Sequence, residues 1–352
     1  MIKATNESGV ANIGFLLVPE FSMLTYTSCI EPLVMANRLS TTRLYQWKTI
    51  GISDEAVTSA CGVPVYPDVT LADSKRFDAV FVCAGGQVQY HTQIEHIRWL
   101  RIMARQKKVV GAVGTGTHLL ARAGLLAGCR CTIHWENIAS LRDQFPELIV
   151  TAKLFEVENQ RYTCAGGSAA LDMFLHEVVS AHGSELASAI AEHLVCDRIR
   201  EKHDGQRALL SRRIGNSQPK LAEVVTLMEA NIEEPMTLGE LSLYSGLSRR
   251  QLERLFQKHL QCVPSRFYLE LRLERARQLL HQTSKPVIDV ARACGFVSAP
   301  HFSKCYRDTF GRPPSGDRNH AFSALESPLA SLQLPTVAGG RSVCHSAVAA
   351  VE

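Results

Sequence analysis

The sequence predicts a parallel-sheet α/β sandwich followed by an all-α domain with two helix-turn-helix units. Short apolar runs alternate with helical segments between residues 10 and 185, which predicts the sheet. Two similar segments, 241–265 and 290–315, predict the helical units. Residues 249–318 contain 14 Lys and Arg against 6 Asp and Glu, whereas the whole chain of 352 residues has a net charge of +4. This uneven charge favours a nucleic-acid-binding module joined to a domain of another kind.

The composition is that of an ordinary globular protein, with 46% hydrophobic and 20% charged residues. The longest apolar run, residues 13–18, is too short to span a bilayer, and the N-terminus lacks the pattern of a secretion signal. The 11 cysteines include no C-x-x-C pair and no cysteine–histidine cluster with zinc spacing. We therefore expect a cytoplasmic protein without membrane contact, metal or cofactor. Its cysteines are either buried small hydrophobic side chains or a redox switch.

The first domain is expected to consist of strands and helices in alternation. The apolar and amphipathic patterns predict a strand at 11–18, a helix at 27–40, strands at 45–53 and 78–86, a helix at 92–106 and a strand at 107–113. Such alternation is typical of a parallel sheet with helices on both faces. Ligands of these sheets bind beyond the carboxyl ends of the strands. Three turns are expected to meet there, at residues 19–23, 84–87 and 114–118.

The turn at Gly114 is the most informative of the three. The apolar "KVVGAV" leads into Gly114-Thr115-Gly116 and then into the amphipathic "HLLARAGLL". A strand-to-helix turn of this kind holds an exposed nucleophile in some proteins and binds a phosphate in others. Gly114 has no side chain that can react. The turn is therefore an active site, a ligand cradle or only a tight corner.

Residues 10–185 resemble the class I glutamine amidotransferase-like, PfpI-type fold. The resemblance rests on "FDAVFVCAGG", on "GAVGTGTHLLARAGLLAG" followed by "TIHWEN", and on "YTCAGGSAALDMFLHEV". It implies a flavodoxin-like sandwich, with a catalytic cysteine at the position of Gly114 and a histidine at that of His134. The cysteine is missing, and Thr115 stands one position away without an obvious base. The sequence thus argues against an enzyme.

A non-covalent ligand suits the same residues better. Free N–H groups at a helix start attract an anion, and Gly114 and Gly116 allow a carboxylate to come close to the backbone. The ring of Trp135 and the carboxylate of Glu136 are groups that hold an ammonium or quaternary ammonium. Together they predict a small zwitterionic amine: an amino acid, a betaine or carnitine. The predicted ligand-binding residues are Phe21 (as a second ring), Ser22, Gly85, Gly86, Gly114, Thr115, His134, Trp135 and Glu136.

A purely structural interpretation of this turn stays open. Trp135 would then belong to the core, Glu136 would be solvated and His134 would have a packing role. The glycines would only permit a tight corner.

The repeated segments carry the signals of two DNA-reading helices. Each copy combines a short helix, a turn with Gly246 or Gly295, and a longer helix with apolar residues at i, i+4 and i+8. Ser248 and Gln251 form a predicted capping box, and Ser298 is the expected cap of the second copy. The basic side chains then face outward, as major-groove recognition requires. Residues 265–283 are predicted to form one connecting helix.

Residues 219–318 closely resemble the DNA-binding domain of the AraC family of transcriptional regulators. The match rests on "SGLSRRQLERLFQKHLQCVPSRFYLELRLERARQLL" and "VIDVARACGFVSAPHFSKCYRDTFGRPP". It implies double-stranded DNA and RNA polymerase as partners. The segment 313–318 departs from the family, which has a bulkier residue before the last Arg. The candidate DNA-binding residues are Arg249, Arg250, Glu253, Arg254, His301, Ser303, Lys304 and Arg307.

The two domains in this order resemble a subgroup of AraC-type activators with an amidotransferase-like sensor domain. Its regulators sense arginine, glycine betaine or carnitine and activate catabolic genes. The resemblance implies a DNA-binding activator controlled by such a ligand. Two alternatives remain: an amidase or hydrolase fused to a DNA-binding module, and a constitutive DNA binder whose α/β domain only dimerises.

The expected domain boundaries follow from composition. A ligand-sensing and dimerisation domain spans 10–200, a linker 201–218 and the DNA-binding domain 219–318, and a disordered tail spans 319–352. The amphipathic end of the first domain, residues 185–200, packs on that domain or forms the contact of a homodimer. We favour the dimer contact, because symmetric binding to paired sites is common.

Overall fold

The computed structural model describes residues 2, 4, 9–73, 77–202, 204–206, 218–283 and 285–318. The chain forms two compact units, Met1–Gln206 and Arg207–Glu352, and each is described by itself. The division falls inside the range expected to be the linker. The predicted tail at 319–352 lies outside the described residues, as does most of the predicted linker.

A mostly parallel seven-stranded sheet forms the centre of the first unit, as the apolar runs predict. Its strand order is β10-β11-β7-β6-β1-β2-β5. Only β10 runs antiparallel to its neighbour, β11. The bounds are β1 Ala11–Leu17, β2 Tyr45–Gly51, β5 Val69–Thr70, β6 Ala79–Ala84, β7 Val109–Gly114, β10 Phe155–Glu158 and β11 Arg161–Cys164. Two small sheets pair β3 (Val57–Thr58) with β4 (Pro64–Val65) and β8 (Arg130–Thr132) with β9 (Ile149–Thr151).

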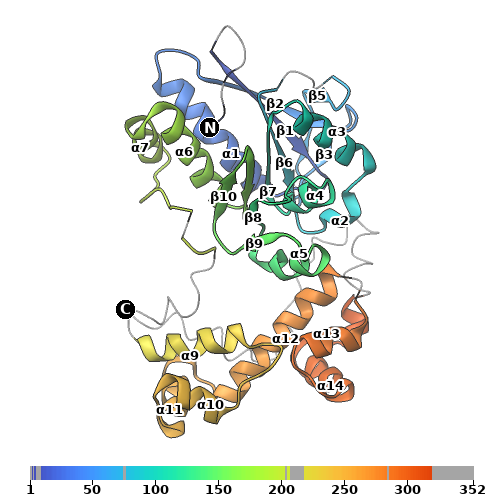
Figure 1. Ribbon diagram of the computed structural model, residues 1–352, viewed down its shortest axis with the longest axis vertical. Coiled ribbons are helices and arrows are strands. Elements are labelled where there is room, and N and C mark those ends of the chain that lie inside the picture. The colour runs from blue at the N-terminus through green and yellow to red at the C-terminus, as the bar shows by residue number, and fades with distance from the viewer. Residues whose placement is uncertain are drawn as a thin grey trace. The chain divides into compact units, whose positions relative to one another are not determined.

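Helices cover both faces of the sheet, which makes three layers (Figure 1). One face carries α1 (Met23–Leu39), α6 (Ala169–His182) and α7 (Ser184–His193). The other carries α3 (Ile94–Arg105), α4 (Thr117–Arg122) and α5 (Ile138–Gln144), with α2 (Val88–His91) nearby. Helix α1 begins at Met23 and not at residue 27, because the Ser22 hydroxyl accepts a hydrogen bond from the Thr25 N–H at 3.2 Å and caps it there.

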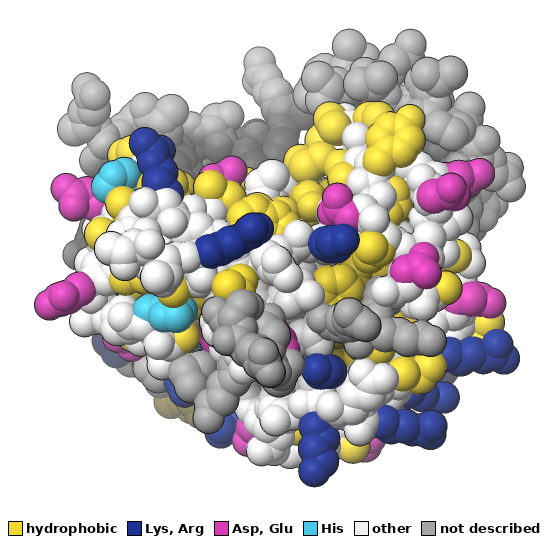
Figure 2. All heavy atoms as spheres, turned by 90° about the horizontal axis from the view of Figure 1, so that it is seen from above, with side chains coloured by type: hydrophobic (Ala, Val, Ile, Leu, Met, Phe, Trp, Pro, Cys, Tyr) yellow, Lys and Arg dark blue, Asp and Glu magenta, His cyan; other side chains and the backbone are white. Residues whose placement is uncertain are grey.

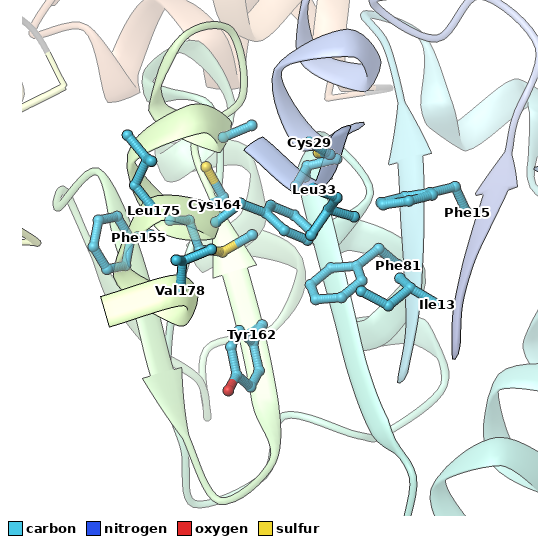
Figure 3. Close-up of a cluster of buried hydrophobic side chains, with 14 of the residues drawn as sticks. Ile13, Phe15, Cys29, Leu33, Phe81, Phe155, Tyr162, Cys164, Leu175 and Val178 are labelled. Atoms are coloured by element: carbon cyan, nitrogen blue, oxygen red, sulfur yellow. The ribbon is translucent and has the colours of Figure 1, made fainter. Parts of the chain in front are cut away.

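The core is built by alternation along the strands. On β1, Ile13, Phe15 and Leu17 face one helical layer, whereas Leu16 faces the other. Figure 3 shows the first of these clusters, in which Ile13, Phe15 and Phe81 from the sheet lie beside Leu33 of α1. This alternation fixes the register of the strands, because a shift by one residue would exchange the two faces.

The end of the first unit packs on its own sandwich. Ala187, Ile190 and Ala191 of α7 are buried in the cluster that includes α1 and α6. Of the two expectations for residues 185–200, packing on the domain is therefore realised.

The second unit consists of helices, with two helix-turn-helix units joined by one long helix. Their bounds are α9 Pro219–Ala230, α10 Leu238–Ser245, α11 Arg249–Leu260, α12 Pro264–Gln282, α13 Val287–Ala293 and α14 Ala299–Phe310. Each unit has its own core, and α12 contributes to both, with Phe267 in the first and Leu273 in the second. The connecting helix predicted for 265–283 is thus confirmed.

A close contact joins the two helix-turn-helix units besides α12. Gly295 has φ +71°, and a Cβ on it would come 2.5 Å from Cγ of Pro235 and 2.7 Å from the carbonyl oxygen of Ile232. Only glycine fits this turn. Arg272 of α12 donates to the carbonyl oxygens of Cys294 and Gly295 at 2.8 and 2.6 Å. The second turn is therefore held from both sides.

Among the described residues, no helix has the length and apolar character needed to cross a membrane. Figure 2 shows one face of the molecule, on which several Lys and Arg side chains gather toward the lower right, whereas Asp and Glu side chains lie mainly at the left and upper right.

Candidate functional site

Gly114 lies at the end of β7 in a turn that is packed against two neighbours. Its φ of +68° belongs to the left-handed region, and a Cβ on it would come 2.7 Å from the carbonyl oxygen of Ala84. A Cβ on Gly166 would in turn come 2.7 Å from Cα of Gly114. These contacts bring the ends of β6, β7 and β11 together, because β7 pairs with both neighbours. The glycines are required by backbone packing, whatever else the turn does.

The turn after β1 joins the same group of strand ends. A Cβ on Gly85 would overlap the carbonyl oxygen of Glu20. The expected meeting of the turns at 19–23, 84–87 and 114–118 is therefore seen in the structure. Gly86 is different, since a side chain there would meet no atom within 4 Å.

Thr115 has a structural role at this turn. Its side chain is buried, and its hydroxyl donates a short hydrogen bond to the carbonyl oxygen of Gly85. The bond ties the turn after β7 to the turn after β6. A hydroxyl held in this way is not exposed as a nucleophile.

The segment His134-Trp135-Glu136 borders the Gly114 turn. The His134 N–H points to the carbonyl oxygen of Gly114 at 3.4 Å. Nδ1 of His134 lies 3.7 Å from Oε2 of Glu136, and the rings of His134 and Trp135 are 5.6 Å apart. Burial lowers the pKa of His134, and the nearby Glu136 carboxylate opposes that shift in part. All three side chains are partly exposed to solvent, so a small molecule can reach them.

Phe21 and Ser22 do not have the positions expected of ligand-binding side chains. Phe21 is fully buried, edge-on to Tyr26 at 5.7 Å, so its ring belongs to the core. The expectation of a second aromatic ring is not met, because the chain turns inward before α1. The Ser22 hydroxyl is engaged as the cap of that helix.

Glu20 was missed by the sequence reasoning and lies at the same edge of the sheet. It has φ +62°, an uncommon conformation for a residue with a side chain. Its carboxylate Oε2 lies 3.6 Å from Nε2 of His91, and the side chain is 43% exposed. A partly exposed carboxylate on a strained turn at the strand ends is a further group for a cationic ligand. The one signal in the sequence was an acidic residue directly after the first strand.

The residues that the structure describes contain no group of three or more His, Cys, Asp or Glu side chains arranged to hold a metal ion.

The first predicted DNA-reading helix is α11. Ser248 and Gln251 form the capping box: the Ser248 hydroxyl accepts from the Gln251 N–H at 3.3 Å, and Oε1 of Gln251 accepts from the Ser248 N–H at 2.8 Å. Leu252 and Phe256 are buried beneath it. The side chains predicted to face outward are all exposed: Arg249, Arg250, Glu253 and Arg254.

The second such helix, α14, is built in the same way. The Ser298 hydroxyl accepts from the His301 N–H at 3.4 Å, as expected of its cap. Phe302 and Tyr306 are buried. Of the predicted contact residues, His301, Lys304 and Arg307 are exposed and Ser303 is half-buried. The two helices thus carry exposed polar faces of the kind that a recognition helix needs.

The unusual segment 313–318 contains a buried carboxylate, that of Asp317, which three side chains share. Oδ2 of Asp317 accepts hydrogen bonds from Tyr306 at 2.7 Å, from Arg277 at 3.1 Å and from His281 at 3.2 Å. These bonds hold the pKa of the carboxyl well below its usual range, with His281 as the largest cause. Arg318 donates to the carbonyl oxygen of Leu280 at 3.3 Å. Asp317 therefore fixes the end of the unit to α12 and α14.

Comparisons with known proteins agree on both units. The model of the DJ-1/PfpI family matches residues 16–181, and that of a helix-turn-helix domain matches residues 241–320. Three HTH-type transcriptional regulators of Pseudomonas aeruginosa are similar over most of the chain. GbdR is 47% identical over 92% of this chain and 88% of its own. CdhR is 42% identical over 90% and 94%, and ArgR is 42% identical over 87% and 92%.

Proposed function

Because the chain belongs to the AraC-type helix-turn-helix transcriptional regulators that carry a DJ-1/PfpI domain, we propose that it is an activator controlled by a small zwitterionic amine. Arginine, glycine betaine and carnitine are the ligands to consider. The protein binds double-stranded DNA, and we propose that it does so as a homodimer that contacts RNA polymerase.

The proposal for DNA rests on the two exposed helix faces. Arg250 and Arg254 on α11 can pair with guanine edges or with phosphates, and Lys304 and Arg307 on α14 supply the same chemistry to a second site. A single helix, α12, connects the two helix-turn-helix units and contributes to both of their cores, so α11 and α14 are held in one domain. This suits two successive stretches of major groove.

The proposal for a non-catalytic sensor rests on the Gly114 turn, which is the observation that carries it. The turn has the backbone of a nucleophile-bearing elbow, but Gly114 has no side chain and the Thr115 hydroxyl is bonded to Gly85. His134 and Glu136 stand beside it without a nucleophile to activate. Such a site can bind a ligand but has no group for covalent catalysis.

The ligand proposed for this site has an anionic and a cationic end. Glu136 and Glu20 are partly exposed carboxylates near the turn, and Trp135 adds a ring. Each cation–π contact contributes about 0.5–2 kcal/mol. The ligand would control DNA binding by favouring one of two states, with a typical coupling free energy of about 1–3 kcal/mol.

A ligand screen followed by DNA binding tests the proposal. The melting temperature of the full chain would be measured with arginine, glycine betaine and carnitine, and any compound that raises it would be added to a selection of bound genomic fragments. We expect one compound to raise the melting temperature and to change DNA affinity. If none binds, the sensor proposal is wrong. Turnover of an amide that is lost in His134→Ala would instead support the enzyme alternative.

A further inference from the structure

The last part of the first unit, residues 198–206, is hydrogen-bonded near two segments that contact the Gly114 turn. We call it the return segment, because it leads from α7 back across the unit; residue 203 lies outside the described residues. Its end, Gln206, is the last residue of the unit, and the chain continues from there toward the DNA-binding helices.

The first bond point lies at the start of α6. The Arg200 backbone N–H donates to Oδ1 of Asp172 at 2.8 Å, and its guanidinium lies 2.6 Å from Oδ2. The same guanidinium donates to the Ser168 hydroxyl at 2.8 Å. Asp172 is buried and the Arg200 side chain is 32% exposed, so salt screens this pair less than it screens a pair on the surface.

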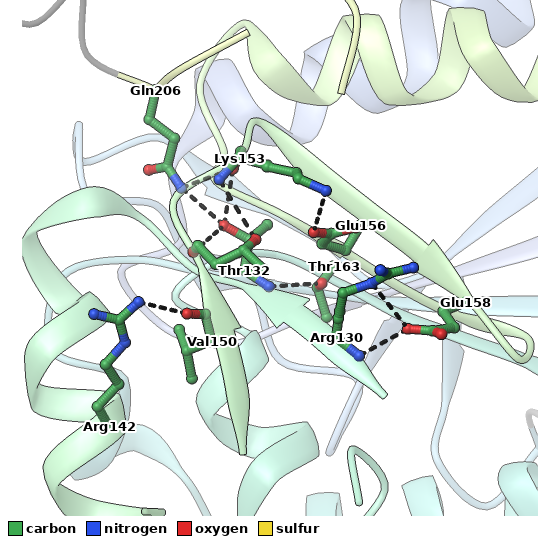
Figure 4. A network of polar contacts seen from close by, with 10 residues as sticks. Arg130, Thr132, Arg142, Val150, Lys153, Glu156, Glu158, Thr163 and Gln206 are labelled. Carbon is green, nitrogen blue, oxygen red and sulfur yellow. Dashed lines mark hydrogen bonds and ion pairs between the residues drawn. The ribbon is translucent and has the colours of Figure 1, made fainter. Parts of the chain in front are cut away.

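The second bond point lies at the end of β8, as Figure 4 shows. Nε2 of Gln206 lies 2.8 Å from the Thr132 hydroxyl and 2.9 Å from the carbonyl oxygens of Ile133 and Lys153. Gly205 also forms an isolated antiparallel bridge with Lys153. Thr132 is fully buried, which places this contact at the edge of the folded core.

Both points are next to groups that touch Gly114. Ser168 follows the Gly166-Gly167 turn, and Gly166 leaves no room for a Cβ beside Gly114. On the other side, Ile133 precedes His134, whose N–H points to the Gly114 carbonyl. The return segment is therefore bonded beside both neighbours of the turn, the Gly166-Gly167 turn and the segment that begins at His134; we call these two neighbours the walls of the turn.

We propose that the return segment is a strap that couples the Gly114 turn to the DNA-binding unit, with Arg200 and Gln206 as its two positioning residues. The coupling to a ligand rests on the function proposed above. A ligand bound at the Gly114 turn shifts the two walls and changes the strength of the Gln206 contact. When this contact weakens, more of the chain before the DNA-binding unit is free to act as linker. The strap itself exists with or without a ligand.

Two single substitutions release the strap, and a third serves as a control. Gln206→Leu removes the donor at β8, and Arg200→Ala removes the pair with Asp172 and Ser168. Arg198→Ala is the control, because Arg198 pairs with Asp204 inside the segment at 2.9 Å and touches neither wall in the contacts described. All three variants would be made in the full chain.

Amide hydrogen exchange without ligand tests the strap alone. The amides of His134 and Gly167 report on the two walls, since they point to Gly114 O and Thr25 Oγ1. We expect faster exchange at these amides in Gln206→Leu and Arg200→Ala, with core strands β1 and β6 unchanged. Exchange equal to that of Arg198→Ala would overturn the proposal.

DNA binding with and without glycine betaine, carnitine or arginine tests the coupling. The wild-type affinity for a bound fragment is expected to change by roughly 5- to 150-fold when the effective compound is added. In Gln206→Leu and Arg200→Ala the compound still binds, but the change in DNA affinity falls toward 1-fold. A full change in both variants refutes the coupling. If no compound binds the wild type, the sensor proposal fails. The hydrogen-exchange measurement, which needs no ligand, still shows whether Arg200 and Gln206 hold the two walls.

Discussion

The carbonyl oxygen of Ala84 lies where a side chain on Gly114 would begin, 2.7 Å from the position of its Cβ. The two residues are partners in the β6–β7 register, so this distance is set by the sheet itself. A residue with a side chain at position 114 must push the strand ends apart. The turn that the ligand is proposed to use is thus also a packing contact.

Gly114→Ala is expected to destabilise the first unit more than Gly124→Ala. Both glycines have nearly the same φ, +68° and +69°, but a Cβ on Gly124 meets no atom within 4 Å. In the control, the free energy of unfolding falls only because alanine disfavours the left-handed conformation, by about 1–2 kcal/mol. In Gly114→Ala it falls further, because the new Cβ clashes with the Ala84 carbonyl oxygen. Urea unfolding followed by tryptophan fluorescence measures the difference, since all three tryptophans lie in the first unit. Equal losses would show that the strand ends yield easily.

Arg254→Ala is expected to weaken specific DNA binding by about 1–3 kcal/mol at one base position if the guanidinium reads a base. The measurement is a set of binding curves on a selected fragment and on its single-base variants. Gln257→Ala, an exposed neighbour on the same helix, is the control. An equal loss on every sequence would identify a phosphate contact, and no loss at all would place Arg254 outside the interface.

Asp317→Asn is expected to lower the stability of the second helix-turn-helix unit by roughly 1–3 kcal/mol, the usual cost of leaving buried partners unsatisfied. Tyr306, Arg277 and His281 all lose the charged acceptor that they share. Faster hydrogen exchange in α12 and α14 of the full chain would measure the loss. Asp308→Asn, on the exposed side of α14, is the control and should leave exchange unchanged.

The first unit is expected to lose stability as the pH falls from about 6.5 toward 4, in part through His96. Its side chain is fully buried, and burial lowers its pKa from 6.5 to about 4. The unfolded state therefore takes up the proton first, and the stability present above pH 6.5 is lost by up to roughly 3 kcal/mol as the pH approaches the folded value.

Replacement of His96 by glutamine isolates this contribution. Nδ1 of His96 accepts from the Gln93 N–H at 3.1 Å at the start of α3, and a glutamine can keep that bond without titrating. Urea unfolding at several pH values should give a flatter profile for His96→Gln than for the wild type. His193→Gln, at an exposed position on α7, is the control. Parallel profiles for His96→Gln and the wild type would contradict the expectation.

The elements were predictable because their signals are local. Apolar alternation is sufficient to place β1, β6 and β7, and the Ser248–Gln251 box marks the start of α11 within the sequence itself. The exposure of Arg250 and Arg254 follows from the burial of Leu252 and Phe256 on the opposite face. Helical periodicity places these two sets of residues on opposite faces of α11, so the burial of one set predicts the exposure of the other.

The surroundings of the Gly114 turn were not predictable in the same way. Gly166 and Gln206 reach this turn or its walls through contacts between residues far apart in the sequence, which no local pattern reports. Phe21 was expected to face a ligand, but its ring is fully buried in the core. The uncommon backbone of Glu20 is likewise imposed by packing against Gly85.

The contact between Gly295 and Pro235 has a consequence for how target promoters can evolve. The two helices proposed to read DNA, α11 and α14, keep one separation, because α12 and this contact both fix it. If they bind DNA as proposed, bases within either half of an operator can change together with single side chains of α11 or α14. An inserted or deleted base pair between the halves would rotate one half around the duplex, and no single substitution could follow it. We therefore expect the promoters of this regulator to drift in sequence while conserving spacing.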